Sequence, residues 1–207
     1  MTVVIGKVNK KTNSVVLTGD SRVSKHTTIA HNICKIFRSG DFYLGIAGAV
    51  PVAQLLKNTV QFPTKELLEK ENVTVDTRFV INHIVPTLKK IVANNGWLDQ
   101  GKFADIQLIL AYQDQLFIID PSFTVIKTDQ AVIGCGTNPA NASLEFRRMG
   151  LDTKKEVMMA IKYATDRDSG CGMPAYLVDT KENIFYTYDA KLQLSEVEDI
   201  ESLQNQW

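Results

Sequence analysis

The order of the predicted elements indicates an α+β fold, a four-layer αββα sandwich with two mainly antiparallel sheets. Two observations and one packing rule support this prediction. Strand-like segments occupy the beginning, the middle and the end of the chain, and a pair of predicted helices separates each set from the next. Short turns join neighbouring strands, which favours antiparallel pairing. Two sheets packed face to face bury their outer apolar faces under helices, so the helices are expected on the outside.

The first third of the chain has the pattern of strands. Residues 2–8 and 14–18 are rich in β-branched side chains and flank a polar turn at 9–13, which predicts a hairpin at the start of the chain. Residues 33–37 form a short strand candidate. Residues 42–47 are a nearly continuous apolar run, typical of a strand that is covered on both faces.

Two helices follow these strands. Pro51 suits the first turn of a helix that ends at about Val60, because its missing N–H costs nothing there. A longer helix is predicted from an Asp76 N-cap to a stop at Gly96, since apolar residues between them repeat at helical spacing. Pro86 lies inside this helix and is expected to kink it.

Strands return in the second half, at residues 106–110, 116–119, 124–127 and 131–133. Two more helices are predicted after them. The first runs from Asn138 to Gly150, and the second runs from Thr153, which has capping-box spacing with Glu156, to about Thr165. The last strands are expected at residues 175–178 and 184–188.

Size and composition suit a single domain over residues 1–207. The 207 residues are 44% hydrophobic and 22% charged, as in an ordinary globular protein. Residues 195–207 are acidic and are expected to form a C-terminal helix or a tail. Lys plus Arg and Asp plus Glu each number 23, so the formal net charge is zero. This balance argues against a nucleic-acid binder, which usually carries a basic excess.

Membrane, metal and cofactor sites are not indicated. No stretch approaches the roughly 18 apolar residues of a membrane-spanning helix, and the N-terminus lacks the charge and apolar core of a signal peptide. We therefore expect a cytoplasmic protein. Cys34, Cys135 and Cys171 form no CxxC pair, so no zinc site is predicted. Gly134-Cys135-Gly136 is half of a dinucleotide fingerprint without its third glycine or a βαβ unit, so no organic cofactor is predicted.

The most informative feature is the second residue. A small residue such as Thr2 permits removal of Met1, which would leave Thr2 with a hydroxyl and a free α-amine. An α-amine has a reference pKa of about 7.7–8.0 and can accept a proton near neutral pH. A threonine hydroxyl is a weak nucleophile unless a base lies beside it, and its own amine can be that base. With Met1 attached, the nitrogen of Thr2 is a non-basic amide.

Four short blocks follow this threonine in order. They are Gly19-Asp20-Ser21-Arg22, Asn32-Ile33-Cys34-Lys35, Gly45-Ile46-Ala47-Gly48-Ala49 and Arg167-Asp168-Ser169-Gly170-Cys171-Gly172. With the penultimate threonine, they resemble the β-type subunits of the proteasome and their HslV-type bacterial relatives, which are N-terminal-nucleophile (Ntn) hydrolases. Proteasome-like proteins of phages and bacteria show similar blocks. The resemblance covers most of residues 2–190 as an order of elements and implies the Ntn-hydrolase fold.

The resemblance implies a division of roles around the start of the chain. Thr2 would be the nucleophile, and the Lys35 ammonium would lie near its oxygen and favour the alkoxide-like transition state. Asp20 would hold Lys35 in place and keep it charged. Gly48 would offer its backbone N–H to the oxyanion.

Three further positions would support the terminal amine. Asp168 stands where the family has an aspartate, and Cys135 and Cys171 stand where the family has serines. Cysteine is the poorer hydrogen-bonding partner. The interval between Asp20 and Lys35 is also one residue shorter than in the family pattern. Both departures weaken the proton relay that the family pattern implies.

The predicted function is therefore that of a threonine endopeptidase of the proteasome β class, with no metal or organic cofactor. Ile33, Ile46 and Val50 are the candidates to line the substrate pocket and would favour apolar residues on the acyl side. The resemblance further implies a homo-oligomeric ring, peptide or unfolded-protein substrates, and an ATP-dependent unfoldase as a possible partner. Two alternatives stay open at this point: a non-catalytic ring or scaffold protein, and an Ntn-type amide hydrolase with a small substrate.

Overall fold

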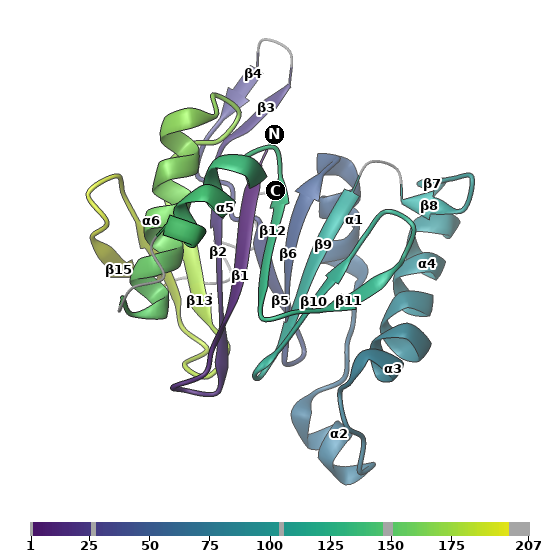
Figure 1. Cartoon of the computed structure of the whole chain (residues 1–207). Coiled ribbons are helices and arrows are strands. Elements are labelled where there is room, and N and C mark those ends of the chain that lie inside the picture. The colour runs from purple at the N-terminus through teal and green to yellow at the C-terminus, as the bar shows by residue number, and fades with distance from the viewer. Residues whose placement is uncertain (1, 26–27, 104–105, 147–150, 199–207) are drawn as a thin grey trace.

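The computed structural model describes residues 2–25, 28–103, 106–146 and 151–198. Two sheets lie face to face, with α5 (Thr137–Phe146) and α6 (Thr153–Arg167) outside one sheet and α1 (Val50–Thr59) and α4 (Val85–Asn94) outside the other (Figure 1). This arrangement confirms the predicted four-layer αββα sandwich.

The first sheet has six strands, and all of its neighbouring strands pair antiparallel. Their order is β12 (Gln130–Gly134), β1 (Val3–Asn9), β2 (Ser14–Asp20), β13 (Ala175–Asp179), β14 (Phe185–Tyr188) and β15 (Leu194–Glu196). The predicted N-terminal hairpin is the β1–β2 pair, in which Val8 lies opposite Val15. Strand β1 is therefore internal, and the start of the chain is fixed between two partner strands.

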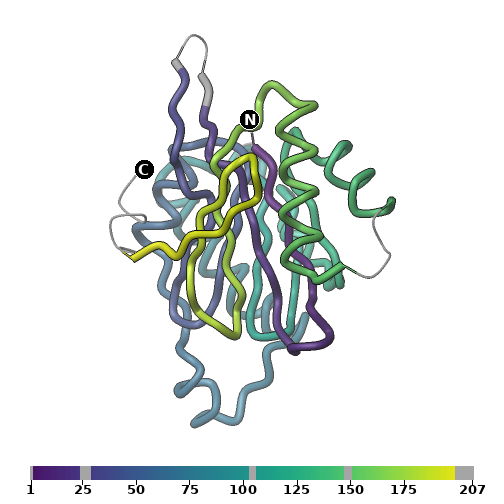
Figure 2. Tube along the Cα trace, turned by 90° about the vertical axis from the view of Figure 1, so that its left-hand side faces the viewer, coloured from purple at the N-terminus to yellow at the C-terminus, as the bar shows by residue number. Residues whose placement is uncertain are grey.

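The second sheet has five strands and is also antiparallel throughout. Their order is β11 (Val125–Lys127), β10 (Gln115–Ile119), β9 (Ile106–Tyr112), β6 (Phe42–Gly48) and β5 (Ile36–Ser39). The ribbon of β3 (Val23–Lys25) and β4 (Thr28–Ala30) projects beyond the sheets at the end where the chain begins, as both views show (Figures 1 and 2). A second short ribbon joins β7 (Leu98–Asp99) to β8 (Lys102–Phe103).

Three apolar clusters hold the layers together. One lies between the sheets and includes Val4, Leu17 and Ile109. Another packs the first sheet against α5 and α6, and a third packs the second sheet against α1 and α4. Because side chains alternate between the two faces of a strand, both faces of the internal strands are apolar. This explains why residues 42–47 form a continuous apolar run.

The structure divides the long helix that was predicted from Asp76 into three successive helical segments. Asp76 does cap a helix, since its Oδ1 accepts the N–H of Phe79 at 2.8 Å. The segment then divides into α3 (Thr77–Phe79), a π-helical turn η1 (Val80–Ile84) and α4, with Pro86 in the first turn of α4. A proline cannot donate the helical hydrogen bond, and the wider π turn absorbs this interruption.

Other sequence predictions are wrong in detail. Glu156 does not complete a capping box, because its carboxylate binds Lys7 Nζ at 2.6 Å. The predicted strand at 33–37 begins only at Ile36, so Lys35 precedes it. Ser195 lies in strand β15 and not in a helix, and residues 199–207 lie outside the described residues. Helix α2 (Lys65–Lys70) and the two short ribbons are additional elements, too short to produce a periodic signal.

Among the described residues, no helix has the length and apolar character needed to cross a membrane.

Candidate active site

The start of the chain lies at one end of the two-sheet sandwich, where β1 begins (Figure 1). Thr2 is only 6% exposed. Its backbone nitrogen lies 3.2 Å from Cys135 Sγ, and its carbonyl oxygen accepts the N–H of Gly136 at 3.3 Å. The loop after β12 therefore holds the backbone of Thr2 in place.

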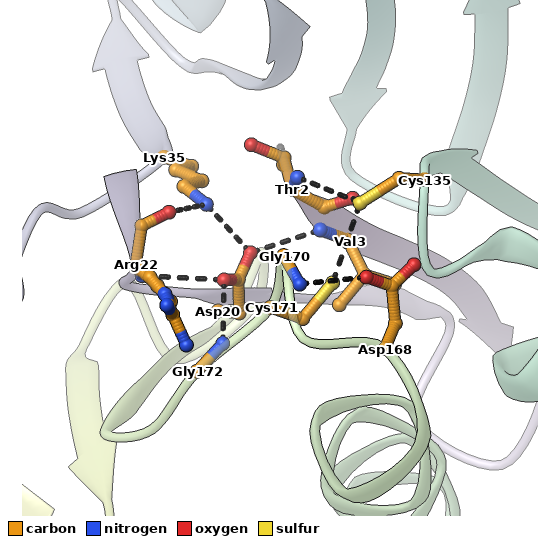
Figure 3. Close-up of polar contacts among 10 residues, drawn as sticks. All are labelled: Thr2, Val3, Asp20, Arg22, Lys35, Cys135, Asp168, Gly170, Cys171 and Gly172. Carbon is orange, nitrogen blue, oxygen red and sulfur yellow. Dashed lines mark hydrogen bonds and ion pairs between the residues drawn. The ribbon is translucent and has the colours of Figure 1, made fainter. Parts of the chain in front are cut away.

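Asp20, the last residue of β2, connects the start of the chain to a buried cation. Its Oδ1 accepts the N–H of Val3 at 2.8 Å and Lys35 Nζ at 2.7 Å. Its Oδ2 accepts the N–H of Arg22 at 3.2 Å and the N–H of Gly172 at 3.0 Å (Figure 3). Two charges removed from water are stable only when they are paired and hydrogen-bonded, and this carboxylate has four donors.

The Lys35 side chain is only 1% exposed, and the Asp20 side chain is fully buried. Lys35 Nζ also donates to the carbonyl oxygen of Arg22 at 2.6 Å. The side-chain oxygen of Thr2 points to the side on which Lys35 lies (Figure 3). The ammonium thus faces the beginning of β1 and not the solvent.

A second group, which we call the thiol–carboxylate cluster, consists of Cys135, Asp168 and Cys171. Cys135 follows β12, and Asp168 and Cys171 follow α6. The two sulfurs are 3.7 Å apart, and one ligand atom from each of the three residues lies within 4.8 Å of the others. The cluster is on the amine side of Thr2, whereas Lys35 is on its hydroxyl side (Figure 3).

The three thiols differ in acidity. A hydrogen bond from Cys171 lowers the pKa of Cys135 to about 7; partial burial opposes this shift, and the N–H of Thr2 adds to it. The same contact and burial raise the pKa of Cys171. Burial raises the pKa of Cys34 to about 12, against the smaller effect of its bond to the Ile36 carbonyl. Cys135 is therefore the thiol that ionises first.

We expect Cys135 to be alkylated faster than the other two thiols. The thiolate is the reactive form, so its rate with iodoacetamide should rise with pH through about 7. Peptide mapping after timed alkylation measures this rate, and Cys135→Ser should remove the fast phase. Faster alkylation of Cys34, which is buried, would contradict the assignment.

Gly134 allows the loop after β12 to approach Thr2. Its φ is +95°, and a Cβ at this position would lie 2.2 Å from the carbonyl oxygen of Thr2. A Cβ added at Gly136 would lie 2.8 Å from Val3 Cβ and 2.9 Å from Cys171 Sγ. The two glycines beside Cys135 thus have a packing role, and their pairing in the sequence was the only signal of it.

Gly134→Ala is expected to destabilise the protein by about 3 kcal/mol or more, from backbone strain and steric overlap combined. Gly101→Ala is the matched control, because Gly101 also has a positive φ, of +80°, but open space around it. It should lose only about 1 kcal/mol, the strain component. Urea denaturation of both variants measures the difference, and equal losses would show that contact with Thr2 is unimportant.

An open pocket of about 430 Å³ lies beside Thr2. Among the described residues, its walls are Thr2, Ala47, Gly48, Ala49, Ile106, Gln107, Pro121, Gly134 and Cys135. Gly48 is the last residue of β6, with a φ of +129°. The pocket therefore opens between the ends of β1, β6 and β12.

The predicted pocket residues Ile33, Ile46 and Val50 are not among the residues that line this pocket. Ile46 is 3% exposed and lies in the cluster between the second sheet and its helices, because it points to the opposite face from Ala47. Ile33 lies in the irregular segment before β5, and Val50 is the first residue of α1. The lining residues come from distant segments, which no local pattern could bring together.

The remaining sequence candidates form two groups. One is the ion pair of Asp20 and Lys35, and the other is the thiol–carboxylate cluster. Thr2 lies between the two groups, and Gly48 lines the same pocket as Thr2.

A model of the proteasome subunit family matches residues 8–176. The chain belongs to the proteasome subunit family. A search of curated protein sequences found no significant match.

Three solved structures illustrate the shared Ntn-hydrolase fold. The BPH protein of Thiobacillus denitrificans in complex with epoxomicin has a TM-score of 0.69 at 17% identity, over 86% of this chain and 97% of that one. HslV from Trypanosoma brucei has a TM-score of 0.60 at 21% identity, over 86% of this chain and 98% of that one. A Gly-1 mutant of Anbu from Hyphomicrobium sp. strain MC1 has a TM-score of 0.62 at 15% identity, over 100% of this chain and 93% of that one.

Proposed function

We propose that this proteasome-family protein is a threonine endopeptidase whose nucleophile is Thr2 after removal of Met1. One observation carries the proposal: Asp20 Oδ1 accepts both Lys35 Nζ and the N–H of Val3. A buried ammonium is thereby fixed beside the residue that begins the mature chain. A structural ion pair elsewhere in the core would not need this link to the N-terminus.

The α-amine of Thr2 is the general base. It takes the hydroxyl proton as Oγ attacks the substrate carbonyl, and the Lys35 ammonium stabilises the negative charge that develops on Oγ. The oxyanion accepts a hydrogen bond from the backbone N–H of Gly48. The protonated amine then gives its proton to the leaving amine, and an acyl ester remains on Thr2. Water activated by the same amine hydrolyses this ester and regenerates the hydroxyl.

The thiol–carboxylate cluster orients the amine in this mechanism. Cys135 Sγ lies 3.2 Å from the nitrogen of Thr2, close enough to accept a hydrogen bond from it. The N–H of Gly170 donates to Asp168 Oδ1 at 2.7 Å and fixes that carboxylate. Cys135, Asp168 and Cys171 are therefore positioning residues, with thiols in place of the hydroxyls of the family pattern.

The pocket indicates the substrate preference. Ala47, Ala49 and Ile106 supply apolar surface, and the described residues that line the pocket include no Asp, Glu, Lys, Arg or His. We expect cleavage after apolar residues, because a charged side chain would lose its hydration there without gaining a partner. A fluorogenic peptide library tests this. A profile dominated by acidic or basic residues on the acyl side would contradict it.

The function is tested with two measurements on the native protein. Mass spectrometry should show loss of Met1. Epoxomicin, a peptide epoxyketone, which is the compound in the Thiobacillus denitrificans complex, should add to Thr2 with its full mass. The hydroxyl adds to the ketone and the amine opens the epoxide, so no group leaves. Retained Met1 together with absent labelling would overturn the proposal.

We further expect a cytoplasmic homo-oligomeric ring that acts on unfolded proteins, with an ATP-dependent unfoldase as its partner. The replacement of two family serines by cysteines specifically favours one alternative, a ring protein without activity, because a thiol is a weak hydrogen-bonding group. Native mass spectrometry gives the ring size. A ring that lacks both labelling and peptide cleavage would support the scaffold alternative.

A further inference from the structure

The thiol–carboxylate cluster has the composition of a site for a soft divalent cation. We propose that Cys135, Cys171 and Asp168, joined by the α-amine of Thr2 in the mature chain, bind one zinc ion in a tetrahedral site. The three side chains already converge, since one ligand atom from each lies within 4.8 Å of the others. No metal-ligand spacing in the sequence predicts this site, because the ligands come from three separate segments.

Two of the ligand separations are close to those of tetrahedral coordination. Zinc binds thiolate sulfur at about 2.3 Å and nitrogen at about 2.0–2.1 Å. Two sulfurs on one tetrahedral zinc are then ~3.8 Å apart, and a sulfur and a nitrogen are ~3.5 Å apart. The observed separations are 3.7 Å between Cys135 Sγ and Cys171 Sγ and 3.2 Å between Cys135 Sγ and the nitrogen of Thr2. The Asp168 oxygen lies within 4.8 Å of both sulfurs, so rotation of its side chain would bring it to the ion.

The surroundings preorganise the ligands. The Gly170 N–H holds one oxygen of Asp168 at 2.7 Å, the kind of second contact that orients a metal-binding carboxylate. The backbone also closes over the cluster at Gly136, where a Cβ would lie 2.9 Å from Cys171 Sγ. Cys171 is 2% exposed, whereas Cys135 is exposed and gives the ion a route to the site.

The donor set selects among metals. Two thiolates with one carboxylate and one amine suit zinc and disfavour Mg²⁺ and Ca²⁺, which prefer oxygen ligands. Binding releases the remaining thiol protons and the proton of the α-ammonium to solvent, because the thiols bind as thiolates and the amine binds through its neutral lone pair. A chain that retains Met1 offers an amide in that position, so it provides three ligands and leaves the fourth to water.

Zinc binding has a consequence for activity, which rests on the proposed function. The lone pair that would accept the hydroxyl proton of Thr2 is then bound to the metal. The amine can no longer act as the base, so zinc should inhibit peptide cleavage and epoxomicin labelling reversibly. A chelator should restore both.

Titration of the reduced, metal-free protein with Co²⁺ and then Zn²⁺ tests the site without reference to activity. We expect one ion per chain, with a thiolate-to-cobalt absorption band that zinc displaces. Because the loss of an outer-shell partner alone weakens metal binding by about 10–100-fold, Cys135→Ser and Cys171→Ser should each weaken it at least 100-fold. Asp168→Asn should weaken it less. Cys34→Ser is the matched control and should bind normally, since Cys34 belongs to a different cluster, between the sheets.

The outcomes separate the two proposals. No cobalt band, or a band that Cys34→Ser removes and Cys135→Ser retains, would overturn the zinc site whatever the activity. A cysteine-dependent band in a protein that epoxomicin never labels, even with a chelator present, would support the zinc site and contradict the peptidase. Labelling that zinc leaves unchanged, despite binding at Cys135 and Cys171, would show that the Thr2 amine is not a ligand.

Discussion

Lys35→Met is expected to destabilise the protein by about 3–5 kcal/mol, the usual effect of leaving a buried charge without its partner. It should also abolish peptide cleavage. Asp20 is fully buried and would keep its backbone donors but lose the ammonium at 2.7 Å. Urea denaturation measures the stability, and hydrolysis of a fluorogenic peptide measures the activity.

Two further variants separate the structural effect from the catalytic one. The double variant Asp20→Asn with Lys35→Met removes both buried charges, so it should recover much of the stability and none of the activity. Lys162→Met breaks the ion pair of Lys162 and Asp166, whose side chains are 34% and 53% exposed, and should change stability by less than about 0.5 kcal/mol. An active Lys35→Met enzyme would exclude Lys35 from the mechanism.

Thr2→Ala should lose peptide cleavage by about 10⁴-fold or more, as expected when a catalytic nucleophile is removed, with little change in melting temperature. Alanine is also small, so Met1 should still be removed. Thr2→Ser keeps both the hydroxyl and the amine and should retain measurable activity and epoxomicin labelling. Cleavage rates and intact masses are measured for all three proteins.

The control for this prediction is Thr59→Ala. Thr59 is an exposed residue of α1, and its hydroxyl donates only to the Leu55 carbonyl, so its removal should leave cleavage unchanged. Wild-type activity in Thr2→Ala would mean that another group performs the chemistry. An equal loss in Thr2→Ser would mean that the γ-methyl group is itself needed to position the hydroxyl.

Much of the fold could be predicted from the sequence because its strands are long and apolar. The β1–β2 hairpin and residues 42–47 have strong β-branched or continuous apolar patterns, and they are strands in the structure. The π turn before Pro86 could not be predicted, because proline shows where a helix is disturbed and not how the backbone adapts. The Glu156 capping box was wrong because a tertiary contact with Lys7 outweighs a local one.

The candidate site was only partly predictable from the sequence. Asp20 and Lys35 were recognisable as a pair through the family resemblance, in which an aspartate holds the lysine, and Asp20 Oδ1 lies 2.7 Å from Lys35 Nζ. The position of Ile46 could not be inferred, since a shift of one residue along a strand moves a side chain to the other face. The convergence of the Cys135 and Cys171 sulfurs depends on the packing of α6 against the sheet, which no local pattern describes.

The carboxylate of Asp20 also bears on the order in which the site can form during synthesis. One of its donors is Gly172, in the last fifth of the chain, and another is Val3 near the first residue. A nascent polypeptide still emerging from the ribosome lacks the first of these while it already carries the second. The arrangement around the lysine can therefore be completed only after Gly172 has been synthesised.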